Sequence, residues 1–329
     1  MWFKELTGFY ETTAEEVRQK LSVKGEILKS HVNDREFRCG RLEILTLCEL
    51  REKVASCQTP VGKLSLNEVV ADVQQLHQRE SNKGALFQVA SQFNLLEMVS
   101  YNVNPEQGVG IYETDNTQGP ACAIAAGAGT IYRNYFARVN GSLGQTEHNQ
   151  IDCLKQLAYA LGNSSGELWE MKNGYALATG AGLREIRRKI LDLSNGQLHS
   201  LKGKLSIGIQ WNTEVTLNNS QQLVSQAFCS ALPVAYSRHP STDWMAFATL
   251  VLQASYEAVI CAGILNYLQT GNNRIYLTLI GGGAFGNDID WIIRAIRRAL
   301  SLYQDVGLDV VVVSHSRSNR HVQELISEF

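Results

Sequence analysis

The second half of the chain alternates short apolar runs with segments of helical periodicity. Residues 275–280 and 308–313 are mostly β-branched, aromatic or aliphatic, which is typical of buried strands. Between them, apolar residues recur at the spacing of a helix that begins near Asp288: Trp291, Ile292, Ala295, Ile296 and Ala299. Further strands are predicted at 205–216 and 226–236, and a long buried helix at 244–268. This alternation predicts an α/β fold with helices on both faces of a sheet.

The first half predicts two strands, at 37–47 and 85–90. A helix is predicted at 66–79, because its apolar residues share one face: Val69, Val70, Val73 and Leu76, with Ser65 or Asn67 as the cap. Other helices are predicted at 13–21, 149–161 and 183–193, the first of them capped by Thr13. The chain has only five prolines and no Pro/Ser-rich linker. We therefore predict one domain over residues 37–329, with residues 1–36 as an extension packed on it.

Composition narrows the class of protein. A hydrophobic content of 44% and a charged content of 19% are ordinary for a globular protein. The net charge of −2, without basic runs interleaved with aromatic residues, argues against a nucleic-acid partner. The N-terminus is unlike a signal peptide, and the longest apolar stretch carries Glu257, so no membrane segment is predicted. The seven cysteines lack metal-ligand spacing, which predicts reduced thiols, a cytoplasmic protein and no metal site.

A glycine-rich turn joins the strand at 275–280 to the helix near Asp288. Gly281, Gly282, Gly283 and Gly286 let backbone N–H groups approach a bulky anion, and the helix N-terminus adds partial positive charge, so the turn predicts a diphosphate site. The glycine spacing also fits a dinucleotide fingerprint, but Ser-His-Ser-Arg follows the next strand where that fold needs an acidic residue. A Walker A loop is excluded, because no Lys-Ser/Thr pair closes the turn. A tight strand-to-helix connection without a ligand remains an alternative.

Carboxylates gather in loops that follow the carboxyl ends of predicted strands, where α/β sheets bind ligands. Asp115 lies in a polar segment that extends from residue 91 to 120, and Asp288 and Asp290 follow the glycine turn. Carboxylates repel phosphates but stabilise the positive charge of a ribosyl oxocarbenium ion, so the set predicts glycosidic cleavage. The alternatives are helix capping for Asp288 and Asp290, and an Asx-turn for Asp115.

Several runs carry a family resemblance. Residues 281–288 resemble the diphosphate-binding loop of the poly(ADP-ribose) glycohydrolase branch of macrodomains, and residues 87–94 resemble its Asn-containing first loop. With Thr117-Gln-Gly-Pro-Ala-Cys-Ala123, the chain resembles most closely the MavL-type macrodomain ADP-ribosylhydrolases. The Gln-Glu-Glu element of the glycohydrolase branch is missing, and Gly108-Val-Gly110 and Glu113-Thr-Asp115 stand in its place.

The resemblance implies a three-layer macrodomain-like fold with a mixed central sheet. It implies hydrolysis of the N-glycosidic bond that joins a single ADP-ribose to an arginine of a protein. ADP-ribose would be the ligand and product, with no other cofactor. The partner would be an ADP-ribosylated protein, and the resemblance makes ubiquitin a candidate. A non-catalytic ADP-ribose reader and a hydrolase of a free metabolite such as ADP-ribose 1″-phosphate remain alternatives.

The same resemblance distributes roles among the candidate residues. Asp115 is the first choice for the acid/base, and Asp288 and Asp290 would hold ribose hydroxyls or the guanidinium. The ligand-binding set would be Asn94, Glu97, Gln118, Gly281, Gly282, Gly283, Ala284, Phe285, Gly286 and Asn287. In this set Asn94 would face the distal ribose, Phe285 would pack against it, and the backbone of 282–287 would meet the phosphates.

Overall fold

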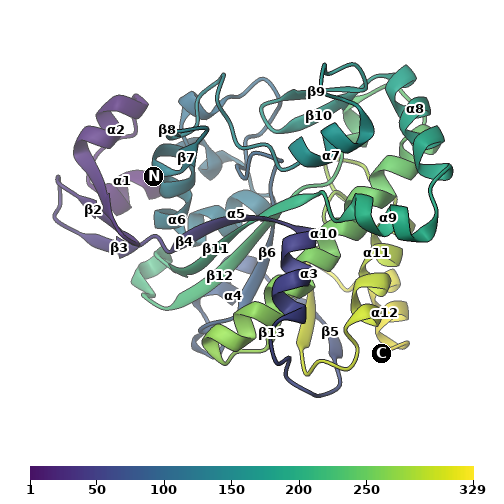
Figure 1. Ribbon diagram of the computed structural model, residues 1–329. Helices are drawn as coiled ribbons and strands as arrows, with labels where there is room; N and C mark the ends of the chain where they lie inside the picture. Colours follow the sequence, from purple (N-terminus) through teal and green to yellow (C-terminus); the bar gives the residue numbers. More distant parts are fainter.

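A seven-stranded mixed sheet forms the centre of the computed structural model, which describes residues 1–329 (Figure 1). Its strand order is β4-β11-β12-β6-β13-β14-β5. Strand β11 is antiparallel to both of its neighbours, and the other four pairs are parallel. The strands are β4 (Arg41–Thr46), β11 (Ser206–Glu214), β12 (Leu223–Cys229), β6 (Leu86–Ala90), β13 (Arg274–Leu277), β14 (Asp309–Ser314) and β5 (Ser65–Val70).

Helices cover both faces of this sheet, which confirms the predicted α/β class. Adjacent residues of β6 show the two faces: Phe87 stacks on His77 of α4, whereas Leu86 lies near Gly263 of α10. Helices α4 (Val73–Gln78), α5 (Gln118–Ala125) and α6 (Gly127–Ile131) form one layer. The other layer is built around α10 (Ser241–Thr270) with α3 (Leu47–Ala55), α8 (Gly180–Leu191), α9 (Asn195–Lys202) and α11 (Ile289–Leu302). The last helix, α12 (Arg320–Ile326), contacts α11 and β5.

Helix α10 is the long buried helix expected from the sequence. It is long and apolar enough to cross a membrane, but 89% of its most apolar window is buried inside the molecule, as in the core helix of a globular protein. Gly263 lets β13 approach it closely, because a Cβ there would lie 2.0 Å from Cδ1 of Ile275. The tight contact fixes α10 against the middle of the sheet.

The predicted helix at 66–79 is wrong over its first half. Residues Ser65–Val70 form β5, which pairs in parallel with β14, and only Val73–Gln78 are helical. The β-branched Val69 and Val70 suit an edge strand, and the side chain of Asp72 then caps α4 by accepting a hydrogen bond from the N–H of Gln74 (2.7 Å).

Other predicted elements are shorter than expected. The strand at 37–47 is divided into β3 (Glu36–Arg38) and β4, because Gly40 takes a positive φ of 74° between them. The helix predicted at 149–161 begins only at α7 (Lys155–Leu161). The N–H of Cys153 instead donates to the carbonyl of Phe93, and Ser206 donates to the carbonyl of Cys153. These bonds hold the preceding segment against the loop after β6.

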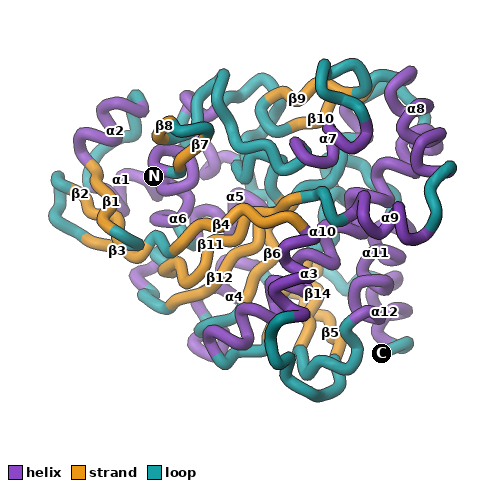
Figure 2. The backbone as a smooth tube through the Cα atoms, in the orientation of Figure 1, coloured by secondary structure: helices purple, strands orange, loops and turns teal.

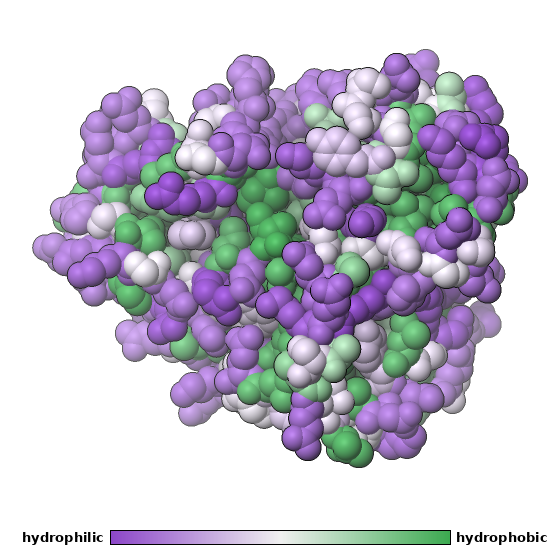
Figure 3. Space-filling model, in the orientation of Figure 1, coloured by the Kyte–Doolittle hydropathy of each residue, from purple (hydrophilic) through white to green (hydrophobic).

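The N-terminal elements form a second, smaller apolar core. Helices α1 (Trp2–Thr7) and α2 (Ala14–Lys20) and the β1–β2–β3 sheet (Leu21–Lys24, Ile27–Ser30, Glu36–Arg38) pack against residues that follow β6, including Leu96, Met98 and Tyr112. Figure 3 shows hydrophobic side chains at the surface near these elements, within an otherwise largely hydrophilic face. The first 36 residues therefore contact the loops at the carboxyl edge of the sheet.

Loops dominate the region above that edge, as Figure 2 shows between α5 and the β9–β10 hairpin. Two short hairpins border it, β7 (Arg138–Val139) with β8 (Ser142–Leu143) and β9 (Trp169–Lys172) with β10 (Tyr175–Ala178). All seven cysteines are free thiols, and five of them are buried.

Candidate functional site

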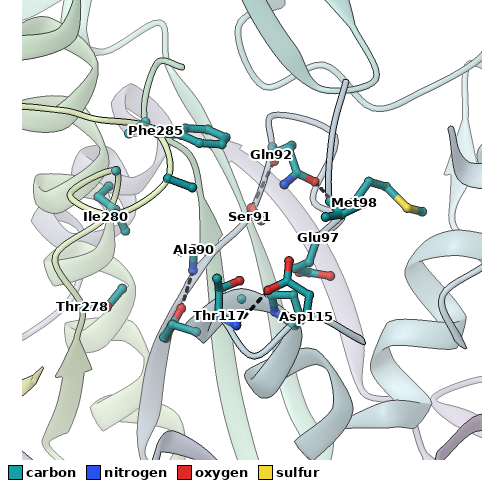
Figure 4. Close-up of a pocket in the computed structure, with 18 of the residues that line it drawn as sticks. Ala90, Ser91, Gln92, Glu97, Met98, Asp115, Thr117, Thr278, Ile280 and Phe285 are labelled. Atoms are coloured by element: carbon teal, nitrogen blue, oxygen red, sulfur yellow. Dashed lines mark hydrogen bonds between the residues drawn. The ribbon is translucent and has the colours of Figure 1, made fainter. Parts of the chain in front are cut away.

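A cavity of about 260 Å³ opens where β6, β12 and β13 end (Figure 4). These three strands are neighbours and parallel, so the loops that begin at Ser91, Ser230 and Thr278 meet at one edge of the sheet. Each of the three loops contributes residues to the cavity wall, and the N-terminal end of α5 and Tyr175 of β10 complete it. The convergence of loops that was expected from the sequence is confirmed.

The glycine turn forms one wall of this cavity. Gly281 and Gly286 adopt positive φ angles of 77° and 67°, and a Cβ on either would clash with Ala231 or Ala235. The backbone N–H groups of Gly283, Ala284 and Phe285 make no hydrogen bond within the chain. Three neighbouring N–H groups without a partner, in a turn that leads into helix α11, are suited to bind an anion. A Cβ on Gly283 would meet no atom, so its surroundings are open.

The two aspartates that follow the turn lie outside the cavity lining. Asp288 caps α11, because its Oδ1 accepts the N–H of Asp290 at 2.9 Å. Both side chains are exposed on the surface. This placement favours the capping interpretation, and their catalytic role stays a prediction. Gly286 does not line the cavity either, but its positive φ shapes the turn.

Glu97 lines the cavity and is fully buried. Its Oε1 lies 3.4 Å from Nη2 of Arg133, and neither side chain is exposed to solvent. Its other oxygen, Oε2, has no hydrogen-bond partner. Burial raises the pKa of Glu97 to about 7, although Arg133 and the hydroxyl of Tyr112 favour the charged form. A carboxyl group that titrates near neutrality can hold or release a proton at physiological pH.

Asp115 lines the same cavity and is half-buried. Its Oδ1 accepts the N–H of Thr117 at 2.8 Å, which is the Asx-turn considered as an alternative from the sequence. Figure 4 shows Asp115 and Glu97 on the same wall, with Phe285 across the cavity. Gly119 allows this arrangement, because a Cβ there would lie 2.0 Å from the carbonyl oxygen of Ala90 and 3.1 Å from Cγ of Glu97.

Two predicted amides serve the framework of the site. Gln118 lines the cavity, but its Oε1 accepts the N–H of Ala90 (2.9 Å) and its Nε2 donates to the carbonyl of Gln88 (2.8 Å). Asn94 lies outside the cavity lining and is buried: its Oδ1 accepts the N–H of Leu96 and its Nδ2 donates to Gln150. Asn94 therefore shapes the loop that carries Glu97 and does not face the cavity as predicted.

An aromatic cluster, which the sequence analysis missed, covers another part of the wall. Tyr175, Tyr236 and Phe285 all line the cavity, with ring centroids 5.3 to 5.6 Å apart. Tyr175 follows the turn of the β9–β10 hairpin, in which Asn173 and Gly174 have positive φ. An Asn-Gly pair between short apolar runs is a strong hairpin signal and could have located this residue.

A second cavity, of about 730 Å³, lies on the other side of the glycine turn. It shares Thr278, Leu279 and Gly283 with the first one, and Gly282 and the buried Asn287 line it. Four basic or titratable side chains also line it, His315, Arg317, Arg320 and His321, among apolar and uncharged polar residues. The two cavities thus differ in charge, with carboxylates on one side of the turn and cationic groups on the other. No group of three or more His, Cys, Asp or Glu side chains lies close enough together to hold a metal ion.

Comparisons with known proteins give structural neighbours only. No protein-family model matches the chain, and no curated sequence matches it. Among solved structures, poly(ADP-ribose) glycohydrolase from Deinococcus radiodurans in complex with ADP-ribose is 11% identical, with a TM-score of 0.48 over 87% of this chain and 94% of its own. The enzyme from Thermomonospora curvata bound to the inhibitor ADP-HPD is 11% identical, with a TM-score of 0.46 over 96% of each chain. These identities and TM-scores are too low to assign a chemistry to this chain, so the chemistry of the site is inferred from its own geometry.

Proposed function

We propose that the protein hydrolyses the glycosidic bond between ADP-ribose and an arginine side chain. The observation that carries this proposal is the cavity in which Glu97 and Asp115 lie beside the glycine turn. A diphosphate needs unpaired N–H donors, and a departing glycosyl group needs carboxylates. The site offers both within one continuous surface.

The charge pattern suggests how the ligand would lie. The carboxylate of Asp115 in the first cavity repels phosphates, so the diphosphate would stay at the free N–H groups of 283–285 and toward Arg317 in the second cavity. The terminal ribose would then enter the first cavity, and the adenosine end would extend into the second. An elongated molecule with anionic charge at its centre fits this order better than a compact metabolite does.

Glu97 and Asp115 would divide the chemistry. Protonated Glu97 would give its proton to the guanidine nitrogen as that nitrogen takes the electron pair of the C1″–N bond. The carboxylate of Asp115 would stabilise the positive charge on the ribose and take a proton from the water that forms the C1″–O bond. Two carboxyl groups in different surroundings, one fully buried and one half-buried, suit this division of roles.

The arginine preference is supported by the wall around Asp115. A guanidinium stacks on aromatic faces and forms directional bonds with a carboxylate. Tyr175 and Tyr236 supply the faces, and Asp115 supplies the carboxylate. Asn116 and Thr117 beside Asp115 are exposed, so a side chain of another protein could reach the cavity. This access disfavours a hydrolase that accepts only a free metabolite.

Incubation with proteins that carry ADP-ribose on arginine, glutamate or serine, and with poly(ADP-ribose), tests the proposal. We expect loss of the arginine modification, and we expect Glu97→Gln to abolish that loss. Loss of a different modification would refute the arginine preference. Tight binding of ADP-ribose without loss of any modification would instead favour the second candidate, a reader that binds ADP-ribose and does not cleave it.

A further inference from the structure

The carboxylate of Glu11, in the segment between α1 and α2, holds a distant loop. Its Oε1 accepts the N–H of Val109 at 2.9 Å and the hydroxyl of Tyr135 at 2.7 Å, and its Oε2 accepts the N–H of Gly110 at 2.5 Å. The contacts join residues about a hundred positions apart in sequence, so they are tertiary contacts and no part of a local turn. Nothing in the proposed chemistry uses this carboxylate.

The loop that Glu11 holds contains the short 3-10 helix η3 (Gly110–Thr114). The residue before η3, Val109, has no side-chain oxygen that could cap it, and Glu11 supplies the missing acceptors from another part of the chain. The carboxylate packs closely against two glycines of this loop. A Cβ on Gly108 would lie 2.5 Å from Oε2 of Glu11, and a Cβ on Gly110 would lie 2.7 Å from the same atom. Both glycines therefore leave room for the carboxylate.

The same helix reaches both carboxylates of the cavity. The hydroxyl of Tyr112, in the middle of η3, accepts the N–H of Glu97 at 3.0 Å. Asp115 follows the last residue of η3, and its N–H donates to the carbonyl of Tyr112 at 3.1 Å. A displacement of η3 would therefore move Asp115 directly and Glu97 through Tyr112.

We infer that Glu11 is a positioning residue for the two catalytic carboxylates, and that the N-terminal extension thereby completes the active site. This inference rests on the proposed function for the identity of the reaction. The glycine turn at 281–286 and the basic cavity are built from other elements and have no contact with Glu11. Loss of Glu11 should therefore impair turnover and leave the affinity for ADP-ribose nearly intact.

Glu11→Gln tests the inference, because it keeps the size of the side chain but directs an amide N–H at donors that need an acceptor. We expect kcat to fall about tenfold to a hundredfold, as a small misplacement of reacting groups does, with KM changed less than about threefold. Tyr135→Phe, which leaves the bonds to Val109 and Gly110, should cost less. Glu15→Gln, an exposed carboxylate of the same extension, should match the wild type.

Hydrogen exchange supplies a readout that does not depend on turnover. In Glu11→Gln, the amides of Val109 and Gly110 should exchange faster, while those of α10 keep their protection. If the wild type cleaves no ADP-ribosyl bond, the proposed function fails, and the exchange result still decides whether Glu11 holds the loop. Unchanged exchange at Val109 and Gly110, or equal losses of kcat, affinity and thermal stability, would overturn the positioning role.

Discussion

Nη2 of Arg133 lies 3.4 Å from Oε1 of Glu97, and both side chains are fully buried. Arg133 is held on its other sides by the carbonyl of Leu95, the hydroxyl of Thr130 and the ring of Phe228. The loss of hydration on burial outweighs the attraction between the two charges, so the pKa of Glu97 is raised. Arg133 remains charged, and Glu97 is the member of the pair that can exchange a proton near neutral pH.

The rate should therefore depend on pH through Glu97. Since its pKa is about 7, the carboxyl group holds its proton below this pH and loses it above. If Glu97 is the general acid, kcat/KM, which reports the free enzyme, falls about tenfold per pH unit above pH 7 and levels off at acidic pH. A pH profile of kcat/KM for ADP-ribosyl-arginine measures this. A rate that rises as the pH passes through 7 would show that the ionised form is the active one.

Replacement of Arg133 should move that profile. The guanidinium lowers the pKa of Glu97, so Arg133→Met should raise this pKa and shift the alkaline fall of kcat/KM to higher pH. Arg133→Lys keeps a positive charge and should shift the fall less. This variant can be measured in place of Arg133→Met if the Met variant does not fold. Arg138→Met, on an exposed neighbour, is the matched control. If the alkaline fall stays at the same pH in both Arg133 variants, Arg133 does not influence the pKa of Glu97.

Asp115 and the aspartates after the glycine turn should behave differently. Asp115→Asn should lower kcat about 10²–10⁴-fold and leave the affinity for ADP-ribose largely intact. Asp290→Asn should retain turnover, because its side chain lies outside the cavity. Asp288→Ala should lower the free energy of unfolding by about 0.5–2 kcal/mol through loss of the helix cap. Kinetics and denaturant unfolding of the three variants check these outcomes, and an inactive but fully ligand-binding Asp290→Asn would restore its predicted catalytic role.

The glycine turn can be tested at Gly283, where an added side chain meets no protein atom. Gly283→Glu should fold normally and abolish binding of ADP-ribose, because its carboxylate would lie where the diphosphate is expected. Gly196→Glu, also in open space but in α9, adds the same charge far from the turn. Calorimetry should show that Gly196→Glu binds ADP-ribose with wild-type affinity and that Gly283→Glu does not bind it. Equal affinities for both variants would rule out the turn as the phosphate site.

Local patterns predicted the fold where neighbouring residues determine it. The strand, glycine turn and helix around residues 274–302 follow one another directly, and Asp288 caps the helix, which was the alternative to its predicted catalytic role. The segment 66–79 failed because its apolar spacing fits a helix, whereas its first half pairs with β14, about 240 residues away. Propensity within a short window cannot include such a partner, and the pairing decides the outcome.

The residues of the site could likewise be predicted where they follow a predicted strand, but their tertiary partners could not. Glu97, Asp115 and Phe285 could be placed at one sheet edge because each follows a predicted strand. Arg133 could not be paired with Glu97 from the sequence, because the two meet only when the helical segment after α6 folds over the loop after β6. One signal was available: Arg133 is a lone cation in an apolar stretch, and a buried arginine needs a partner.

The central claim is that the cavity cleaves the bond between ribose and arginine. A peptide with one ADP-ribosyl-arginine, followed over time by mass spectrometry, tests it most directly. The account predicts that the wild type yields unmodified arginine peptide and free ADP-ribose in equal amounts, and that Glu97→Gln binds ADP-ribose but yields neither. A peptide that stays modified while the wild type binds ADP-ribose tightly, or that loses AMP and keeps ribose phosphate on the arginine, would contradict it.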